Sequence, residues 1–176
     1  VLSHRGLVNN ARFYASRCRV TEATTWVNIM PMFHTSGCGM VTLGCLQAGC
    51  RMVLVSLFDP DEVLDQLEAN GADIILGVPT MVVALLEAQE ARPRDLSALK
   101  LVSCGGSMVA PELVRRVQNL MGAEFSTLYG QTEYCPVITQ HHLSDSIDDI
   151  CNTAGQPVAQ TEVSIRSVDD NLAVDI

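Results

Sequence analysis

A repeated alternation between short β-rich runs and longer runs of helical periodicity constrains the fold of this 176-residue chain most. Such alternation is typical of a mostly parallel sheet, because a helix returns the chain to the starting edge before each new strand. We therefore predict an α/β fold with helices on both faces of the sheet, in three layers (α/β/α). The expected strands are residues 25–30, 51–55, 73–78, 99–104 and 123–128, and the expected helices are residues 2–17, 38–48, 60–70, 80–90 and 111–121.

Local capping signals mark where several of these helices begin and end. Ser3 favours the N-cap of the first helix, and Asp59-Pro60 joins an N-cap residue to a proline at the first helical position. Glycine readily adopts the left-handed conformation that closes many helices, and Gly71 and Gly122 each follow a predicted helix. These signals bound the helices at 60–70 and 111–121.

The pattern changes after Pro136. A short apolar run at 137–140 is followed by a polar stretch at 141–152 and by alternation at 162–168. Alternation indicates an antiparallel strand with one face exposed to water, so we expect a short β-rich C-terminal piece. The predicted organisation is an α/β subdomain at 1–140 and the start of a β-rich subdomain at 141–176.

Composition excludes several classes of function. Hydrophobic residues make up 48% of the chain and charged residues 18%, which favours a packed globular protein over disorder. The net charge of −9, without a Lys/Arg cluster, argues against a nucleic-acid partner. No stretch approaches the roughly 18 apolar residues of a membrane span, and the N-terminus lacks a signal-peptide layout.

The cysteines predict the compartment. Seven are present, an odd number without CxxC spacing, and most lie among apolar neighbours. Buried, reduced thiols are therefore favoured over disulfides or a zinc site, and we expect a cytoplasmic protein.

Two loops that follow predicted strands carry the residues of chemical interest. In open α/β sheets, ligands bind outside the carboxyl ends of the strands, and residues 103–107 and 129–133 occupy such ends. In the first loop, Gly105-Gly106 lets the backbone approach a flat ligand closely. The alternative interpretation is a simple turn, because glycine is the default residue at positive φ.

The second loop, Tyr129-Gly130-Gln131-Thr132-Glu133, has the groups that a nucleotide and a metal require. Tyr129 offers a ring for stacking on a base, Thr132 a hydroxyl for a phosphate oxygen, and Glu133 a hard oxygen ligand for Mg²⁺. A Thr-Glu pair after a strand is about as often a helix cap, which is the alternative here.

Histidines provide the remaining candidates. His34 follows another predicted strand and is placed to contact a carboxylate or to gate a cavity, although a lone loop histidine is often only a solvated side chain. The pair His141-His142 has no carboxylate or cysteine at ligand spacing, so we expect both to lie on the surface.

Five elements in order give the chain a family resemblance. The order resembles that of the adenylate-forming (AMP-binding) enzymes, and within them it looks most like the acyl-CoA synthetases of fatty-acid and 4-coumarate type. The elements are residues 31–37 (PMFHTSG), 78–80 (VPT), Gly105-Gly106-Ser107 before residues 111–113 (PEL), 129–133 (YGQTE) and 155–157 (GQP).

The resemblance implies roles for individual residues. Tyr129 is expected to stack on adenine, with Gly130 in the same nucleotide-binding element, and Thr132 to contact the α-phosphate of ATP or AMP. Glu133 is expected to hold Mg²⁺, and His34 to lie near the acyl carboxylate and the path of coenzyme A. Gly105, Gly106 and Ser107 are expected to form the other side of the pocket that holds the base and the acyl group.

The same resemblance implies chemistry and also some missing parts. Enzymes of this type join a carboxylic or fatty acid to AMP with loss of pyrophosphate and then pass the acyl group to the thiol of coenzyme A. Their lysine-ended phosphate loop, ribose-binding aspartate, following arginine and small C-terminal domain have no counterpart here. Because the chain begins at Val1 without methionine and ends within an apparent element at 173–176, we expect an internal fragment of a large N-terminal domain that is inactive alone.

Two alternatives remain open from the sequence. The chain could be an adenylation module of a peptide synthetase, although it shows no clear aspartate to hold a substrate amine. It could also be a non-catalytic α/β interaction domain in which Gly105-Gly106 and Thr132-Glu133 are only structural.

Overall fold

The computed structural model describes residues 1–174 and confirms the α/β class. Its sheet runs in the order β2-β1-β3-β4-β5-β6-β7, in which β1 to β5 are parallel and β6 and β7 are antiparallel to their neighbours. The strands are β1 (Thr25–Asn28), β2 (Arg51–Leu54), β3 (Ile74–Gly77), β4 (Leu101–Gly105), β5 (Glu124–Gly130), β6 (Val137–Gln140) and β7 (Gln156–Pro157).

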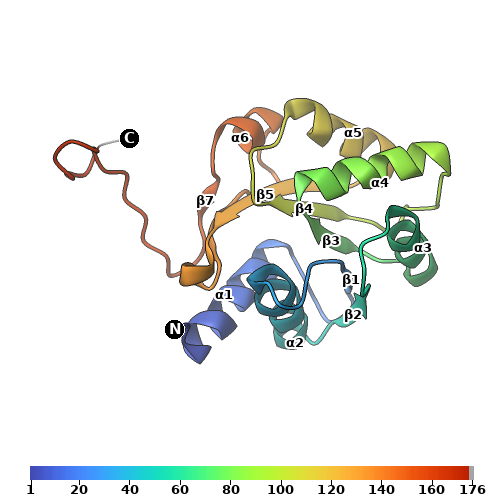
Figure 1. Cartoon of the computed structure of the whole chain (residues 1–176), viewed down its shortest axis with the longest axis horizontal. Coiled ribbons are helices and arrows are strands. Elements are labelled where there is room, and N and C mark those ends of the chain that lie inside the picture. The colour runs from blue at the N-terminus through green and yellow to red at the C-terminus, as the bar shows by residue number, and fades with distance from the viewer. Residues whose placement is uncertain (175–176) are drawn as a thin grey trace.

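Helices cover both faces of the sheet, as expected for three layers (Figure 1). One face carries α1 (His4–Arg17), the π-helix η1 (Ser36–Thr42) and α2 (Leu43–Ala48). The other face carries α3 (Pro60–Asn70), α4 (Pro79–Ala91), α5 (Pro111–Met121) and α6 (Ile147–Asn152), and a 3₁₀ turn, η2 (Thr132–Tyr134), lies between β5 and β6. Across the described residues, no helix is long and apolar enough to cross a membrane.

The predicted capping signals are confirmed. Ser3 accepts a hydrogen bond from the Gly6 amide, and Asp59 accepts one from the Glu62 amide, each at 3.0 Å. Gly71 and Gly122 both adopt positive φ, at 53° and 66°, after the last helical residue. These local interactions satisfy backbone groups that a helix end leaves without intrahelical partners.

Each layer has its own apolar core. The larger core lies between the sheet and α3 to α5, and the smaller lies between the sheet, α1 and η1. In the smaller core, Trp26 and Tyr14 are fully buried and pack together with ring centroids 5.7 Å apart. Met30 and Met40 belong to this same cluster, so the residues that wall the site described below are anchored in the core.

Two predictions of local structure are wrong, and one helix was not predicted. The helix expected to begin at residue 38 begins at Ser36, as a π-helix. The polar stretch at 141–152 contains α6, whose start has a capping box between Ser146 and Asp149. The strand expected at 162–168 does not form, because this segment is exposed and makes only an isolated bridge from Arg166 to Ala173.

The C-terminal part of the chain departs from the sheet after β7. Val158 still packs in the smaller core and donates to the Ile138 carbonyl, and Figure 1 shows the end of the chain running away from the body as an extended tail. The division into subdomains at 140/141 stays a prediction, and the expected element at 173–176 extends into residues 175–176, outside the described residues.

Candidate functional site

Two cavities lie side by side at the carboxyl edge of the parallel strands, where α/β proteins bind ligands. We call the first the β3 cavity, with a volume of about 210 Å³, and the second the α6 cavity, of about 470 Å³. Gly106, Leu128 and Gly130 line both cavities, so the two meet along the ends of β4 and β5. The β3 cavity is lined by Met30, His34, Thr35, Ser36, Met40, Leu76, Gly77, Val78, Gly105, Gly106, Leu128, Gly130, Gln131, Thr132 and Pro136. The α6 cavity is lined by residues 106–109, 127–130 and 150–154.

The loop between β1 and η1 forms one wall of the β3 cavity and is folded by buried polar contacts. Asn28 is fully buried, and its side-chain amide donates to the Gly37 carbonyl at 3.2 Å and accepts from the Met30 amide at 3.1 Å. A Cβ added at Gly37 would lie 2.4 Å from the Pro31 carbonyl oxygen. Only glycine therefore allows the chain to turn this tightly into η1.

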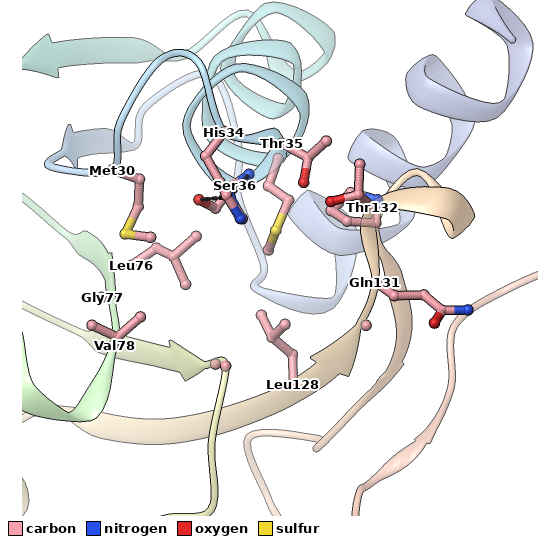
Figure 2. Close-up of a pocket in the computed structure, with 15 residues that line it drawn as sticks. Met30, His34, Thr35, Ser36, Leu76, Gly77, Val78, Leu128, Gln131 and Thr132 are labelled. Atoms are coloured by element: carbon pink, nitrogen blue, oxygen red, sulfur yellow. Dashed lines mark hydrogen bonds between the residues drawn. The ribbon is translucent and has the colours of Figure 1, made fainter. Parts of the chain in front are cut away.

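The orientation of His34 follows from two hydrogen bonds (Figure 2). The Ser36 amide donates to His34 Nδ1 at 3.1 Å, and the Ser36 hydroxyl lies 2.8 Å from the same nitrogen. Because an amide can only donate, Nδ1 is the acceptor, and the neutral ring carries its proton on Nε2. His34 thus presents an N–H donor from an exposed position at the cavity lining.

Thr35 supplies a hydroxyl group that has no partner. Its Oγ1 atom is buried and makes no hydrogen bond, although the residue lines the β3 cavity. In Figure 2 the Thr35 hydroxyl points toward Thr132, which lines the same cavity from the β5 side. Buried hydroxyl groups are normally paired, so this one is an unsatisfied hydrogen-bonding group in a residue of the cavity wall.

The Gly-Gly turn lies where the two cavities meet. Gly106 adopts φ of +94°, a conformation that residues with side chains rarely adopt. A Cβ at Gly105 would approach Leu128 Cδ1 to 2.9 Å. Both glycines therefore have steric reasons to be present, and the backbone of this turn is open to both cavities.

The end of β5 passes between the cavities. The strand runs through Tyr129 and Gly130, two residues farther than predicted, and its pairing with β6 is irregular at this point. A Cβ at Gly130 would lie 2.1 Å from the Pro136 carbonyl oxygen, which accepts a hydrogen bond from the Gln131 amide at 2.8 Å. Tyr129 is 53% exposed and lines the α6 cavity.

Thr132 and Glu133 occupy the η2 turn at the mouth of the site. Thr132 lines the β3 cavity, whereas Glu133 is exposed and lines neither cavity. Within residues 1–174 no three His, Cys, Asp or Glu side chains are grouped closely enough to hold a metal ion. A lone, accessible carboxylate still fits Mg²⁺, which often takes one or two carboxylates together with substrate phosphates.

The surface prediction for His141 is wrong, because its side chain is fully buried between β5 and α6. Its Nε2 lies 3.0 Å from the Asp149 carbonyl oxygen, which can only accept, and Nδ1 lies 2.7 Å from the Thr127 hydroxyl. The neutral Nε2–H tautomer satisfies both contacts, and Thr153 Oγ1 donates to the same carbonyl at 2.9 Å. His141 therefore connects α6 to β5 directly behind the α6 cavity, where Thr127 and Thr153 are lining residues.

Several ionisable groups near the site have shifted pKa values, and burial raises the pKa of Cys151, which lines the α6 cavity. Burial raises the pKa of the Cys104 thiol to about 12, so this residue beside Gly105 is a neutral thiol at neutral pH and not a nucleophile. The Ser146 hydroxyl lowers the pKa of Asp149, whose carboxylate completes the capping box of α6. All seven cysteines are free, as predicted.

The structure thus gathers most of the predicted site residues at one place. His34, Gly105, Gly106, Gly130 and Thr132 line the β3 cavity, and Ser107 and Tyr129 join Gly106 and Gly130 in the α6 cavity. The lining residues that sequence reasoning missed come mainly from the core and from α6: Met30, Leu76, Leu128 and residues 150–154. The capping box at Ser146 was the available signal for α6.

Comparison with known proteins gives the same family across nearly the whole chain. The model of the family described as "AMP-binding enzyme" matches residues 1–174. The acyl-CoA synthetase-like protein YngI of Bacillus subtilis is 36% identical over 166 residues, which cover 94% of this chain and 30% of that protein. The medium-chain fatty-acid–CoA ligase of Escherichia coli is 30% identical over 170 residues, covering 97% of this chain and 29% of the ligase.

A solved structure shows the same fold. The crystal structure of a long-chain-fatty-acid–CoA ligase from Archaeoglobus fulgidus superimposes with a TM-score of 0.90 at 25% identity, covering 100% of this chain and 37% of that one. The chain therefore spans about a third or less of the length of the proteins it matches.

Proposed function

The chain belongs to the AMP-binding enzyme family, and from that premise we propose that it forms the substrate-binding core of an ATP-dependent carboxylic acid–CoA ligase. The acid is expected to be a fatty acid or a similarly apolar acid. The names of the relatives support this choice over a peptide-synthetase module, because they include acyl-CoA and fatty-acid–CoA ligases.

The proposed reaction has two steps. In the first, a carboxylate oxygen of the acid attacks the α-phosphorus of ATP, the bond to the bridging oxygen breaks, and pyrophosphate leaves with the electron pair. In the second, the thiol of coenzyme A loses its proton, its sulfur attacks the acyl carbon, and AMP leaves. Charge builds up on the α-phosphate oxygens in the first step, so donors aimed at this point lower the barrier.

The residues at the meeting point of the two cavities are suited to this step. The His34 Nε2–H group can donate to a carboxylate oxygen of the acid. The Thr132 hydroxyl can donate to an α-phosphate oxygen, and the exposed Glu133 would hold Mg²⁺ beside the phosphates. The metal, when bound, would supply positive charge that offsets the charge of the phosphates.

The α6 cavity is the proposed place of the adenosine. Its volume of about 470 Å³ lies in the range of roughly 300–1,000 Å³ that is usual for ligand sites of this size. Tyr129 offers a half-exposed ring for stacking on adenine, opposite the backbone of Gly106 and Ser107. The acyl group would then extend into the β3 cavity.

The observation that carries this proposal is the junction of the cavities at Gly106, Leu128 and Gly130. A cavity lined by the half-exposed Tyr129 ring adjoins the β3 cavity, whose lining includes the candidate phosphate ligand Thr132. An acyl-adenylate has this same layout, with an adenosine, a phosphate junction and an apolar tail.

Calorimetric titration of the 176-residue chain with AMP and with 5′-O-(N-octanoylsulfamoyl)adenosine, a stable acyl-adenylate mimic, tests the proposal. We expect both to bind and the acyl mimic to bind more tightly. Tyr129→Ala should weaken both by about tenfold or more, the usual effect of removing an aromatic ring stacked on a base. Tyr134→Ala is the matched control, because Tyr134 is 39% exposed and lines neither cavity.

The outcomes separate the candidate functions. Binding of neither ligand, or equal effects of the two tyrosine variants, would contradict a nucleotide site and favour an interaction domain. Tighter binding of an aminoacyl sulfamoyladenosine than of the octanoyl compound would instead indicate a peptide-synthetase module.

We further propose that these 176 residues do not catalyse acyl-adenylate formation by themselves. Their single lysine, Lys100, precedes β4 at the opposite edge of the sheet and pairs with Asp73 at 2.5 Å. No lysine of this chain therefore reaches the phosphates, and we expect no ATP–pyrophosphate exchange above the blank. A cytoplasmic location is proposed because all seven cysteines are free thiols.

A further inference from the structure

We propose that the β3 cavity selects compact apolar acids of about eight carbon atoms, and that Thr35 binds the polar end of the acid. This inference rests on the proposed function and specifies its substrate. It depends on three features of the β3 cavity: its volume, its closed apolar end and the orphan hydroxyl of Thr35.

The volume sets the size of the acid. An apolar protein cavity of about 150 Å³ is large enough to bind benzene. The β3 cavity, at about 210 Å³, exceeds that by about 60 Å³, roughly the volume that two water molecules occupy in the liquid. It therefore holds a six-carbon ring and about two further carbons, or a flexible chain of about the same number of atoms.

The far end of the cavity is closed by the core. Met30, Met40 and Leu76 are 8%, 3% and 2% exposed and belong to the cluster around the buried Trp26. Figure 2 shows Met30, Leu76 and Val78 together on one side of the cavity, opposite Thr35 and Thr132. A longer chain would have to displace packed core residues, whereas the flexible thioethers tolerate either a ring or a chain within the same volume.

The opposite end of the cavity is polar, which orients the acid. The Thr35 hydroxyl is buried without a partner, and the Thr132 hydroxyl lines the same side. An acid that enters with its apolar part toward Met30 places its oxygens between these two hydroxyl groups. Thr35 then gains in the complex the hydrogen bond that it lacks in the free chain.

A chain-length series tests the size limit. The probes are N-acylsulfamoyl adenosines with butanoyl, hexanoyl, octanoyl, dodecanoyl and hexadecanoyl groups and with 3-phenylpropanoyl, titrated calorimetrically into the 176-residue chain. Affinity should rise by about fourfold for each carbon that becomes buried, up to about eight carbons, and should then fall. Hexadecanoyl binding as tight as octanoyl binding would overturn the proposal.

Met40→Ala tests whether the core side chains set this limit. The substitution removes about three non-hydrogen atoms, so the preferred chain should lengthen by about three carbons. Met121→Ala is the matched control, because Met121 is 4% exposed in the other core and lines neither cavity. An unchanged preference in Met40→Ala, or an equal shift in Met121→Ala, would contradict the assignment. If Met40→Ala does not fold, the chain-length series with the wild-type chain still tests the size limit.

Thr35→Val tests the orphan hydroxyl. In the free chain the substitution removes an unpaired polar group, so the melting temperature should stay unchanged or rise. Binding of the octanoyl mimic should weaken by about three- to tenfold, the usual effect of one lost hydrogen bond. Thr42→Val is the control, because the Thr42 hydroxyl donates to the Gly37 carbonyl at 2.8 Å and its loss should lower the melting temperature.

The results also distinguish this proposal from the broader one. If adenosine sulfamate without an acyl group binds but the series shows no maximum near eight carbons, the size limit fails and the nucleotide site stands. If no analogue binds, both proposals fail. If wild type and Thr35→Val bind the octanoyl mimic with equal affinity, Thr35 does not bind the polar end of the acid.

Discussion

The two cavities of this protein are built by different means, although they share Gly106, Leu128 and Gly130. The β3 cavity is walled by strand ends, the η1 helix and buried core side chains such as Met40. The α6 cavity is walled by the loop after β4, which includes the 88% exposed Met108, and by α6, which is held in place through His141. Packed core side chains thus make up much of the wall of the β3 cavity. The α6 cavity combines core residues (Val109, Ile150 and Cys151) with an exposed loop and the polar contacts of His141.

This difference has a functional consequence. A cavity formed by a close-packed core changes shape only at a cost in stability, so it is suited to select a ligand by size. A cavity that has an exposed loop as one wall can adjust, which suits a flat base whose recognition depends on stacking. The comparison predicts that variants will affect the two kinds of ligand separately, except at the shared residues.

Gly130→Ala should have the largest effect because it acts on both cavities. The new Cβ would lie 2.1 Å from the Pro136 carbonyl oxygen, so the loop from β5 to β6 must move. We expect a loss of about 3 kcal/mol or more in unfolding free energy and loss of binding of both AMP and the octanoyl mimic. Denaturant titration and calorimetry measure the two effects.

Gly122→Ala is the matched control for this substitution. Gly122 also has positive φ, but a Cβ there would meet nothing within 4 Å. It should cost about 1–2 kcal/mol from backbone strain and leave both ligands bound. Retained binding in Gly130→Ala would show that the two cavities do not share this wall.

His141→Ala should affect the α6 cavity alone. It leaves the Thr127 hydroxyl without its His141 partner, removes one of the donors to the Asp149 carbonyl and opens a cavity where the buried ring was, so we expect a loss of about 2–4 kcal/mol in unfolding free energy. AMP binding should weaken by about tenfold, while the acyl chain-length preference stays at about eight carbons. His141→Gln, which keeps a donor and an acceptor, should recover part of the AMP affinity, and His142→Ala should behave like the wild type.

Acidification should produce the smallest and most local effect. The pKa of Asp149 is lowered by its hydrogen bond from Ser146, so the contribution of this carboxylate to stability is complete above its usual pKa near 4. It is lost as the pH falls through the lower pKa of the folded state, which loosens the start of α6. AMP affinity should therefore decline below about pH 4 in the wild type and equally in Asp148→Asn, which keeps Asp149, whereas Asp149→Asn should show the weaker affinity already at neutral pH.

The sequence predicted the elements that depend on local chemistry. The helices bounded by Asp59 and Gly71 and by Pro111 and Gly122 appear with the expected ends, because caps and left-handed glycines act over a few residues. The strand-end location of Gly105 and Tyr129 also followed from the alternation of strands and helices. These positions needed no knowledge of distant contacts.

The features that were missed depend on contacts between distant residues. His141 looked like a surface residue because its partners Thr127 and Asp149 lie 14 and 8 residues away and converge only after α6 folds onto β5. The π-helical start at Ser36 and the orphan hydroxyl of Thr35 result from the tight turn at Gly37. The strand expected at 162–168 failed because alternation forms a strand only where a partner strand is present.

A crystal structure of the chain with 5′-O-(N-octanoylsulfamoyl)adenosine tests the central claim most directly, namely that one ligand spans both cavities. We expect the adenine ring against Tyr129 in the α6 cavity, the sulfamate at the junction near Gly106 and Gly130, and the octanoyl chain ending at Met30 and Met40. A ligand in the reverse orientation, or with its acyl chain outside the β3 cavity, would contradict it.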